Sequence, residues 1–177
     1  MMKRILAFAG SNSQSSINKK FVQYVANQIE GEVDFLDIAE FNPPIYGIDH
    51  EESDGIPQST LDLNEKLSAF DALIISANEH NGASSAFFKN HVDWLSRNDR
   101  NFLKDKKLFL LSTSPGRGGA KMSLSYLVEV LPRFGAEVVS QFSLASFGHS
   151  FSKDQGITDA NQEKEFRKAL KNFQDNI

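Results

Sequence analysis

Short apolar runs alternate along this chain with longer stretches in which apolar residues recur every three or four positions. Residues 5–9 and 72–77 are nearly continuous apolar runs, which are typical of parallel strands buried on both faces. Residues 87–95 instead carry large side chains at positions i, i+4, i+7 and i+8, which predicts a helix packed against a sheet. The same patterns predict five strands at 5–9, 33–38, 72–77, 108–111 and 138–139, and helices at 17–29, 63–70, 87–95, 127–134 and 166–173.

This alternation predicts an α/β fold. Strands that are each followed by a helix form a parallel sheet with right-handed crossovers, covered by helices on both faces in a three-layer sandwich. The length of 177 residues favours a single domain over residues 1–177. Gly31 is placed to end the first helix, and residues 39–57, which hold three of the five prolines, are expected to form an irregular connection.

Composition and charge exclude several classes of protein. A net charge of −4 provides neither the basic surface of a nucleic-acid-binding protein nor a polybasic membrane patch. Cysteine is absent, which removes disulfides, thiolate zinc sites, iron–sulfur clusters and a cysteine nucleophile. His50, His91 and His149 have no partner at ligand spacing, so we expect no metal site.

The hydropathy of the chain bears on its location. The apolar run 5–9 is too short for the hydrophobic region of a signal peptide, and Gly10 begins a polar stretch instead of a cleavage site. No apolar stretch approaches the ~20 residues of a membrane span. We therefore expect a cytoplasmic protein without a membrane or nucleic-acid partner.

Polar loops follow three of the predicted strands. Ligands of such sheets bind outside the carboxyl ends of the strands, where the strand order reverses. The first loop, residues 10–18, carries four hydroxyls and three amides before a predicted helix. Free backbone N–H groups and the positive end of the helix dipole make this an anion site, and the alternative is a serine-rich helix cap. The loop has neither the Gly-Lys-Ser/Thr of a P-loop nor a G-x-G-x-x-G pattern.

The other two loops suit a planar ligand. Residues 78–82 read Asn-Glu-His-Asn-Gly, and their amide, carboxylate and backbone groups match the hydrogen-bonding edge of a heterocycle. The alternative is a plain turn before a helix. Residues 112–120 contain three glycines, which let the backbone approach a ligand closely. Arg117 in this loop is either a contact to an anionic nicotinamide nucleotide or a solvated charge. The three loops converge if the strand order is 2-1-3-4-5.

The chain resembles the NAD(P)H-dependent FMN reductases of flavodoxin-like fold, relatives of quinone, azo-dye and chromate reductases. The phosphate signature of that family, Gly-Ser-x-Arg-x-x-Ser-x-Asn, is matched by Gly10, Ser11, Ser16 and Asn18. Ser13 stands where the family has Arg, so a hydroxyl replaces one charged phosphate contact.

Further motifs of the family follow in order. Its Pro-Glu-Tyr-Asn element is matched by Glu79 and Asn81, whereas Asn78 and His80 replace Pro and Tyr. Residues 88–97 resemble its Leu-Lys-Asn-Ala-Ile-Asp-Trp-Leu-Ser-Arg run, which is the most specific part of a resemblance that covers about the first 140 residues.

The resemblance implies a flavodoxin-like fold and FMN as cofactor. It also implies NADPH or NADH as electron donor, flavin, quinone or a similar small molecule as acceptor, and a homodimer or homotetramer. The chemistry then belongs to FMN and requires no catalytic side chain. Phosphate contacts are implied for Ser11, Ser13, Ser16, Ile17 and Asn18. Ring contacts are implied for Asn78, Glu79, His80, Asn81, Gly82, Ser114 and Gly116.

Two alternatives remain open at this point. A protonated His80 beside the ring would favour the anionic reduced flavin, and the other interpretation is a neutral imidazole that caps the loop. The function as a whole could also be that of a flavodoxin-type electron carrier without NAD(P)H turnover. Such carriers are commonly far more acidic and hold the ring between aromatic side chains, and residues 78–82 contain none. A phospho-receiver of the same strand order is disfavoured, because residues 10–11 are Gly-Ser and not acidic.

Overall fold

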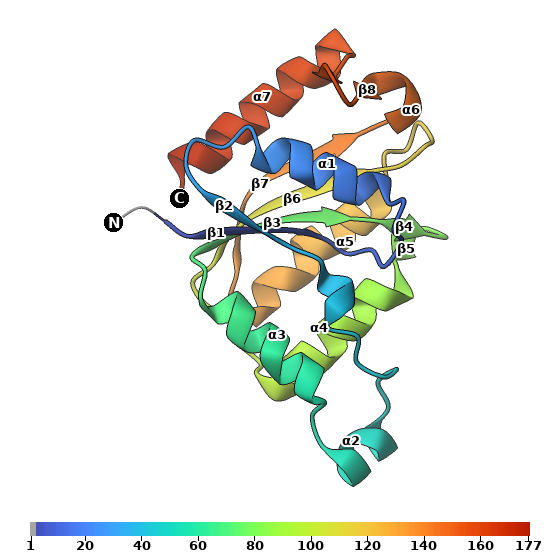
Figure 1. The fold of residues 1–177 in the computed structure, drawn as a ribbon, viewed down its shortest axis with the longest axis vertical. Coiled ribbons are helices and arrows are strands. Elements are labelled where there is room, and N and C mark those ends of the chain that lie inside the picture. Colours follow the sequence, from blue (N-terminus) through green and yellow to red (C-terminus); the bar gives the residue numbers. More distant parts are fainter. Residues whose placement is uncertain (1–2) are drawn as a thin grey trace.

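The computed structural model describes residues 3–177, and a five-stranded parallel sheet forms its centre (Figure 1). In spatial order the strands are β2 (Val33–Leu36), β1 (Ile5–Ala9), β3 (Ala72–Ala77), β6 (Lys107–Thr113) and β7 (Glu137–Leu144). Counted along the chain within this sheet, the order is 2-1-3-4-5, so the predicted topology is confirmed. The order reverses between β1 and β3, which pair in parallel from Ile5–Ala72 to Ala9–Ser76.

Helices cover both faces of the sheet and complete the three predicted layers (Figure 1). One face carries α1 (Ile17–Ala26) and α7 (Ala160–Asp175), and the other carries α3 (Gln58–Ser68), α4 (Ala86–Asn98) and α5 (Lys121–Val130). Strand β1 is buried along its whole length because its side chains alternate between the two layers. Leu6 and Phe8 join the core cluster beneath α3, α4 and α5, whereas Ile5 and Ala7 join the cluster beneath α1 and α7.

Two connections differ from the sequence-based expectation. Helix α1 ends at Ala26 and not at Gly31, because two tighter turns follow it and carry Ile29 into the core. The stretch 39–57 is not irregular throughout, since it contains α2 (Ile48–Asp54), which projects from the body of the molecule and buries none of its side chains (Figure 1).

The remaining elements are short. They are η1 (Ile38–Glu40), β4 (Glu79–His80), β5 (Ala83–Ser84), η2 (Leu131–Phe134), α6 (Phe147–Ser150), β8 (Phe151–Ser152) and β9 (Gly156–Ile157). Strands β4 and β5 form one antiparallel hairpin, and β8 and β9 form another. Within residues 3–177, every helix is too short or too polar to cross a bilayer.

Candidate functional site

The three polar loops meet at the carboxyl edge of the sheet, because β1, β3 and β6 are neighbours. The backbone N–H of Gly10 donates to Ser76 O at 3.0 Å and so ties the first loop to the end of β3. Ser85, the residue before α4, donates its hydroxyl to Gly10 O at 3.0 Å. The first loop is therefore fixed both to the neighbouring strand and to the helix that follows the second loop.

Asn18 joins α1 to the ends of two strands. Its Oδ1 accepts from Ser76 Oγ at 2.8 Å and from Thr113 N–H at 3.2 Å, and its Nδ2 donates to Thr113 O at 3.2 Å. The side chain is only 4% exposed. These contacts make Asn18 a clamp that sets the position of the first turn of α1, and its predicted contact to a phosphate stays a prediction.

The first loop combines a helix cap with an anion-binding end. Ser16 Oγ accepts the backbone N–H of Lys19 at 3.2 Å and caps α1. This cap satisfies one of the amides of the first turn, and among the hydrogen bonds of residues 3–177 none takes up the N–H of Ile17 or Asn18. The two readings of the loop are thus compatible, because a capped helix still presents free N–H groups and a positive dipole end.

Lys19, in the first turn of α1, does not contribute its charge to this anion site. Lys19 extends away from it and forms an ion pair with Asp37 at 2.7 Å. Burial raises the pKa of Asp37, but the hydrogen bonds from Lys19 and Ala39 outweigh it and hold that pKa below its usual value. Ser13, which stands at the position of the family's Arg, is tied to Ser11 by a backbone N–H bond of 3.3 Å to the Ser11 hydroxyl.

The second loop is the β4–β5 hairpin. Asn81 and Gly82 occupy its two central positions with φ values of 53° and 77°, the left-handed geometry of a two-residue turn. Gly82 accepts this geometry without strain. His80 is exposed on this hairpin opposite Ala83.

Glu79 connects the hairpin to α5. Its Oε2 accepts from the backbone N–H of Met122 at 3.0 Å and of Ser123 at 3.1 Å, and Ser123 Oγ donates to Asn78 O at 2.8 Å. The residue before α5, Ala120, has no capping side chain, so the carboxylate of Glu79 caps that helix from another part of the chain. The predicted ring contact of Glu79 stays a prediction.

Asn78 carries a buried oxygen without a partner. Its Oδ1 accepts no hydrogen bond from any residue within 3–177. A buried acceptor left unsatisfied costs about 1–3 kcal/mol. Asn78 directly follows β3, next to the point where the strand order reverses, so a ligand bound there could supply the missing donor.

The third loop is held from two sides. Ser112 Oγ donates to Gly119 O at 2.7 Å, within the loop. On the other side, the backbone N–H groups of residues 146 and 147 donate to Gly116 O at 2.9 Å and to Ser114 O at 3.0 Å. Ser114 and Gly116 therefore have a fixed backbone, whereas Arg117 between them and Gly119 is exposed.

The 88–97 motif has a positioning function that the sequence did not reveal. Asn90 Nδ2 and Trp94 Nε1 both donate to Pro44 O, at 3.0 Å and 2.7 Å. Residues 41–46, which connect η1 to α2, are thereby held against α4. The partners lie almost 50 residues apart in the chain, so no local pattern could have indicated this contact.

His91 contributes to the same attachment. Its Nε2 lies 2.8 Å from Phe41 O, and its Nδ1 lies 2.8 Å from Phe87 O. Protonation would let both nitrogens donate, but burial disfavours the charged ring more strongly and lowers the pKa of His91. His91 is therefore a buried histidine that packs between α4 and the segment at Phe41.

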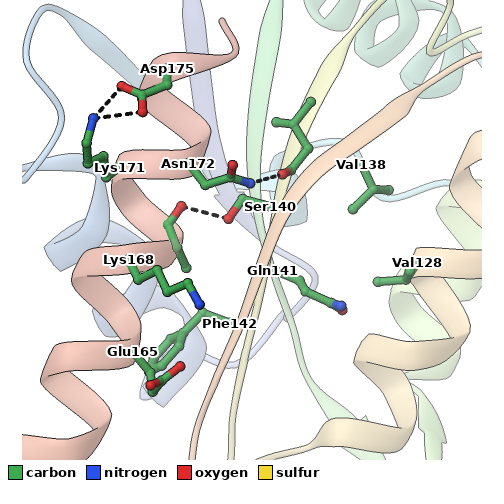
Figure 2. A pocket seen from close by; sticks show the side chains of 12 residues that line it. Val128, Val138, Ser140, Gln141, Phe142, Glu165, Lys168, Lys171, Asn172 and Asp175 are labelled. Carbon is green, nitrogen blue, oxygen red and sulfur yellow. Dashed lines mark hydrogen bonds and ion pairs between the residues drawn. The ribbon is translucent and has the colours of Figure 1, made fainter.

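A cavity of about 680 Å³ lies away from these loops, along β7 between α5 and α7 (Figure 2). Two of its polar side chains are engaged within the protein: Ser140 Oγ donates to Ala169 O at 2.7 Å, and Asn172 Nδ2 donates to Val139 O. The charged residues that line it balance one another and are Glu165, Lys168, Lys171 and Asp175. This groove runs along the edge strand β7, between α5 and α7, and is not the anion site.

Comparisons with known proteins show the family of this chain. A family model described as NADPH-dependent FMN reductase matches residues 3–150. The NADH:(hydroxy)cinnamate reductase subunit CrdA of Vibrio ruber is 25% identical over 174 residues, which cover 95% of this chain and 84% of that protein. A quinone reductase of Escherichia coli is 28% identical over 98 residues, or 55% of this chain and 52% of that protein.

Among solved structures, FerB from Paracoccus denitrificans, a flavoenzyme NAD(P)H:(acceptor) oxidoreductase, is similar with a TM-score of 0.78 and 25% identity. The match covers 98% of this chain and 96% of that one. The predicted flavodoxin-like fold and the predicted family are confirmed, and FMN and NAD(P)H are the cofactor and electron donor that the family implies. The chain belongs to the NADPH-dependent FMN reductase family.

Proposed function

We propose that this chain binds FMN at the carboxyl edge of its sheet and uses it to pass electrons from NAD(P)H to a small acceptor such as a flavin or a quinone. The observation that carries the proposal is the pairing of free backbone N–H groups at the start of α1, on Ile17 and Asn18, with a buried, unpartnered oxygen on Asn78. The first suits a phosphate and the second suits a hydrogen-bonding heterocycle. When bound, FMN supplies the hydride chemistry.

Residues at the start of α1 would hold the phosphate of FMN. The backbone N–H groups of Ile17 and Asn18 and the hydroxyls of Ser11, Ser13 and Ser16 are the donors available there. The helix dipole adds a favourable field without a counter-ion. We propose Asn18 as a positioning residue whose amide side chain holds this turn in place.

Residues of the second and third loops would hold the ring. The Asn78 amide and the backbone of the hairpin supply hydrogen-bonding groups on one side, and Ser114 and Gly116 border the ring on the other. Glu79 keeps the hairpin attached to α5 while the ring is bound. No side chain needs to move a proton for hydride transfer.

The spectrum of the purified protein tests this function. We expect saturable binding of FMN, anaerobic bleaching of the bound flavin by NADPH or NADH, and steady turnover with free flavin or a quinone. Bleaching without turnover would identify an electron carrier, and FMN binding without bleaching would leave a binding module. Failure to bind FMN would refute the proposal.

Ser16→Ala is expected to weaken FMN binding about tenfold, because it removes a phosphate donor and the cap of α1. The variant should lose about 1 kcal/mol of unfolding free energy. A matched control is Asp159→Ala, which removes the cap of α7 far from the site. Fluorescence titration with FMN and urea unfolding separate the effects, and equal FMN affinities in the two variants would contradict the assignment.

His80→Phe is expected to flatten the pH dependence of the flavin reduction potential. A protonated His80 would stabilise the reduced anion, so the wild-type potential should fall more steeply with rising pH than that of the variant. The control is His149→Phe, at an exposed histidine outside the hairpin. Identical profiles for wild type and His80→Phe would mean that His80 only borders the loop.

We further propose that residues 1–177 act as one domain in the cytoplasm and assemble as a homodimer or homotetramer. Helix α7 packs on the same sheet as the elements of the family match, which supports one domain. Met122, 64% exposed, and Tyr126, 37% exposed, lie on α5 beside the hairpin and support self-association there. Light scattering of the purified protein tests the assembly, and a monomer at micromolar concentration would refute it.

A further inference from the structure

An aromatic groove lies beside the first loop, between α1 and the α6–β8 segment. It has a volume of about 610 Å³, within the range of small-molecule sites. Phe147 and Phe151 stack in it at 4.7 Å between ring centroids, and Tyr24 meets Phe151 edge to face at 5.3 Å. Such a wall of rings favours a flat aromatic ligand.

The shape of the groove is built into the backbone. Gly156, in β9, has a φ of 74°, and a Cβ there would come within 2.3 Å of the Tyr24 ring. A glycine is thus required for the β8–β9 hairpin to close against Tyr24. This close approach places the Tyr24 ring against the β8–β9 hairpin.

The charge of the groove is unusual for this chain. Lys20 and Lys153 line it, and no carboxylate does. The ion pairs within residues 3–177 all involve other side chains, so both ammonium groups are uncommitted. Glu163 and Arg167 of α7 also act on Tyr24, and they form an ion pair with each other. Two unpaired lysines beside aromatic rings favour an aromatic anion as the ligand of this groove.

The groove also adjoins the candidate cofactor site. Lys20 lies in the first turn of α1, one turn from the Ser16 cap. Phe147 donates its backbone N–H to Ser114 O at 3.0 Å, on the third loop. A ligand in the groove therefore lies next to the residues proposed to hold FMN.

We propose that this groove binds the adenosine 2′-phosphate end of NADPH, with the purine against Tyr24 and Phe151 and the 2′-phosphate between Lys20 and Lys153. The inference rests on the proposed function, because that reaction requires a dinucleotide whose nicotinamide reaches the flavin while its other end lies elsewhere. NADH lacks the 2′-phosphate, so the two lysines give the enzyme a preference for NADPH.

Steady-state kinetics of the FMN-loaded Lys20→Gln/Lys153→Gln double variant tests the proposal. We expect the KM for NADPH to rise about tenfold and the KM for NADH to rise less than about threefold, since only NADPH loses charge-assisted hydrogen bonds to its 2′-phosphate. The matched control, Lys104→Gln/Lys164→Gln, removes the same charge from exposed positions outside the groove and should keep the wild-type ratio. Phe151→Leu should weaken both nucleotides equally, because both carry adenine.

Calorimetry adds a readout that does not depend on turnover. Adenosine 2′,5′-bisphosphate should bind the FMN-loaded wild type in a salt-dependent manner, and the double variant at least about tenfold more weakly. An unchanged ratio of NADPH to NADH KM values, in a protein that still bleaches with both nucleotides, would overturn this inference alone. A tenfold loss of FMN affinity in the double variant would also overturn it and would assign the lysines to the FMN phosphate. Absence of bleaching in the wild type would refute the proposed function itself.

Discussion

Asn18→Ala is expected to lower the free energy of unfolding by about 3 kcal/mol and to weaken FMN binding more than tenfold. The substitution removes three hydrogen bonds and leaves the backbone of Thr113 and the hydroxyl of Ser76 buried without partners. Each orphaned group costs about 1–3 kcal/mol, partly relieved by relaxation or entry of water. The first turn of α1 would also lose its attachment to the sheet, and with it the fixed position of the amides proposed to bind phosphate.

Urea unfolding and FMN titration measure these two effects. The matched control is Asn27→Ala, an exposed asparagine at the end of the same helix, which should change stability by less than about 0.5 kcal/mol. Wild-type stability with reduced FMN affinity would instead make Asn18 a direct ligand of the cofactor. Wild-type values in both measurements would remove Asn18 from the site altogether.

Trp94→Ala is expected to cost about 4 kcal/mol of unfolding free energy. Trp94 is fully buried, and its Nε1 donates to Pro44 O at 2.7 Å. The variant leaves a cavity beside α4 and removes one of the hydrogen bonds that hold residues 41–46. Hydrogen exchange at the Tyr46 N–H, which donates to Asn90 Oδ1, should therefore accelerate. Met122→Ala, at an exposed position, is the control. Slow exchange at Tyr46 in the variant would show that Asn90 and His91 hold this segment without Trp94.

The layered fold could be predicted from the chain because its strands are short apolar runs and its helices are periodic. Residues 5–9 and 72–77 are strands with the predicted bounds, since burial on both faces leaves a pattern that needs no distant partner. The end of α1 could not be predicted, because Ile29 continues the helical spacing although the backbone has already tightened into turns. The α2 helix was missed because none of its residues is buried, so its sequence lacks the apolar residues at every third or fourth position that predict a helix.

The convergence of the three polar loops at the carboxyl edge of the sheet could be predicted, but the hydrogen bonds within and between these loops could not. Asn18 and Glu79 carry the polar groups expected of ligand contacts, yet their hydrogen bonds go to protein groups 95 and about 44 residues away. The sequence shows which hydrogen-bonding groups a side chain carries, but it does not show which distant residue will be its hydrogen-bond partner. The aromatic groove was missed for the same reason, since Tyr24 and Phe151 come from segments that meet only in the folded chain.

The outer edge of strand β7 restricts how copies of this chain can join. The Asn172 side-chain amide donates a hydrogen bond to the backbone carbonyl of Val139, and helices α5 and α7 flank the strand (Figure 2). An incoming strand would have to displace that amide before it could extend the sheet, which protects this border against fibre-like growth. We therefore expect that a neighbouring copy does not extend the sheet at β7. Copies should instead contact one another through side chains on helical or loop surfaces.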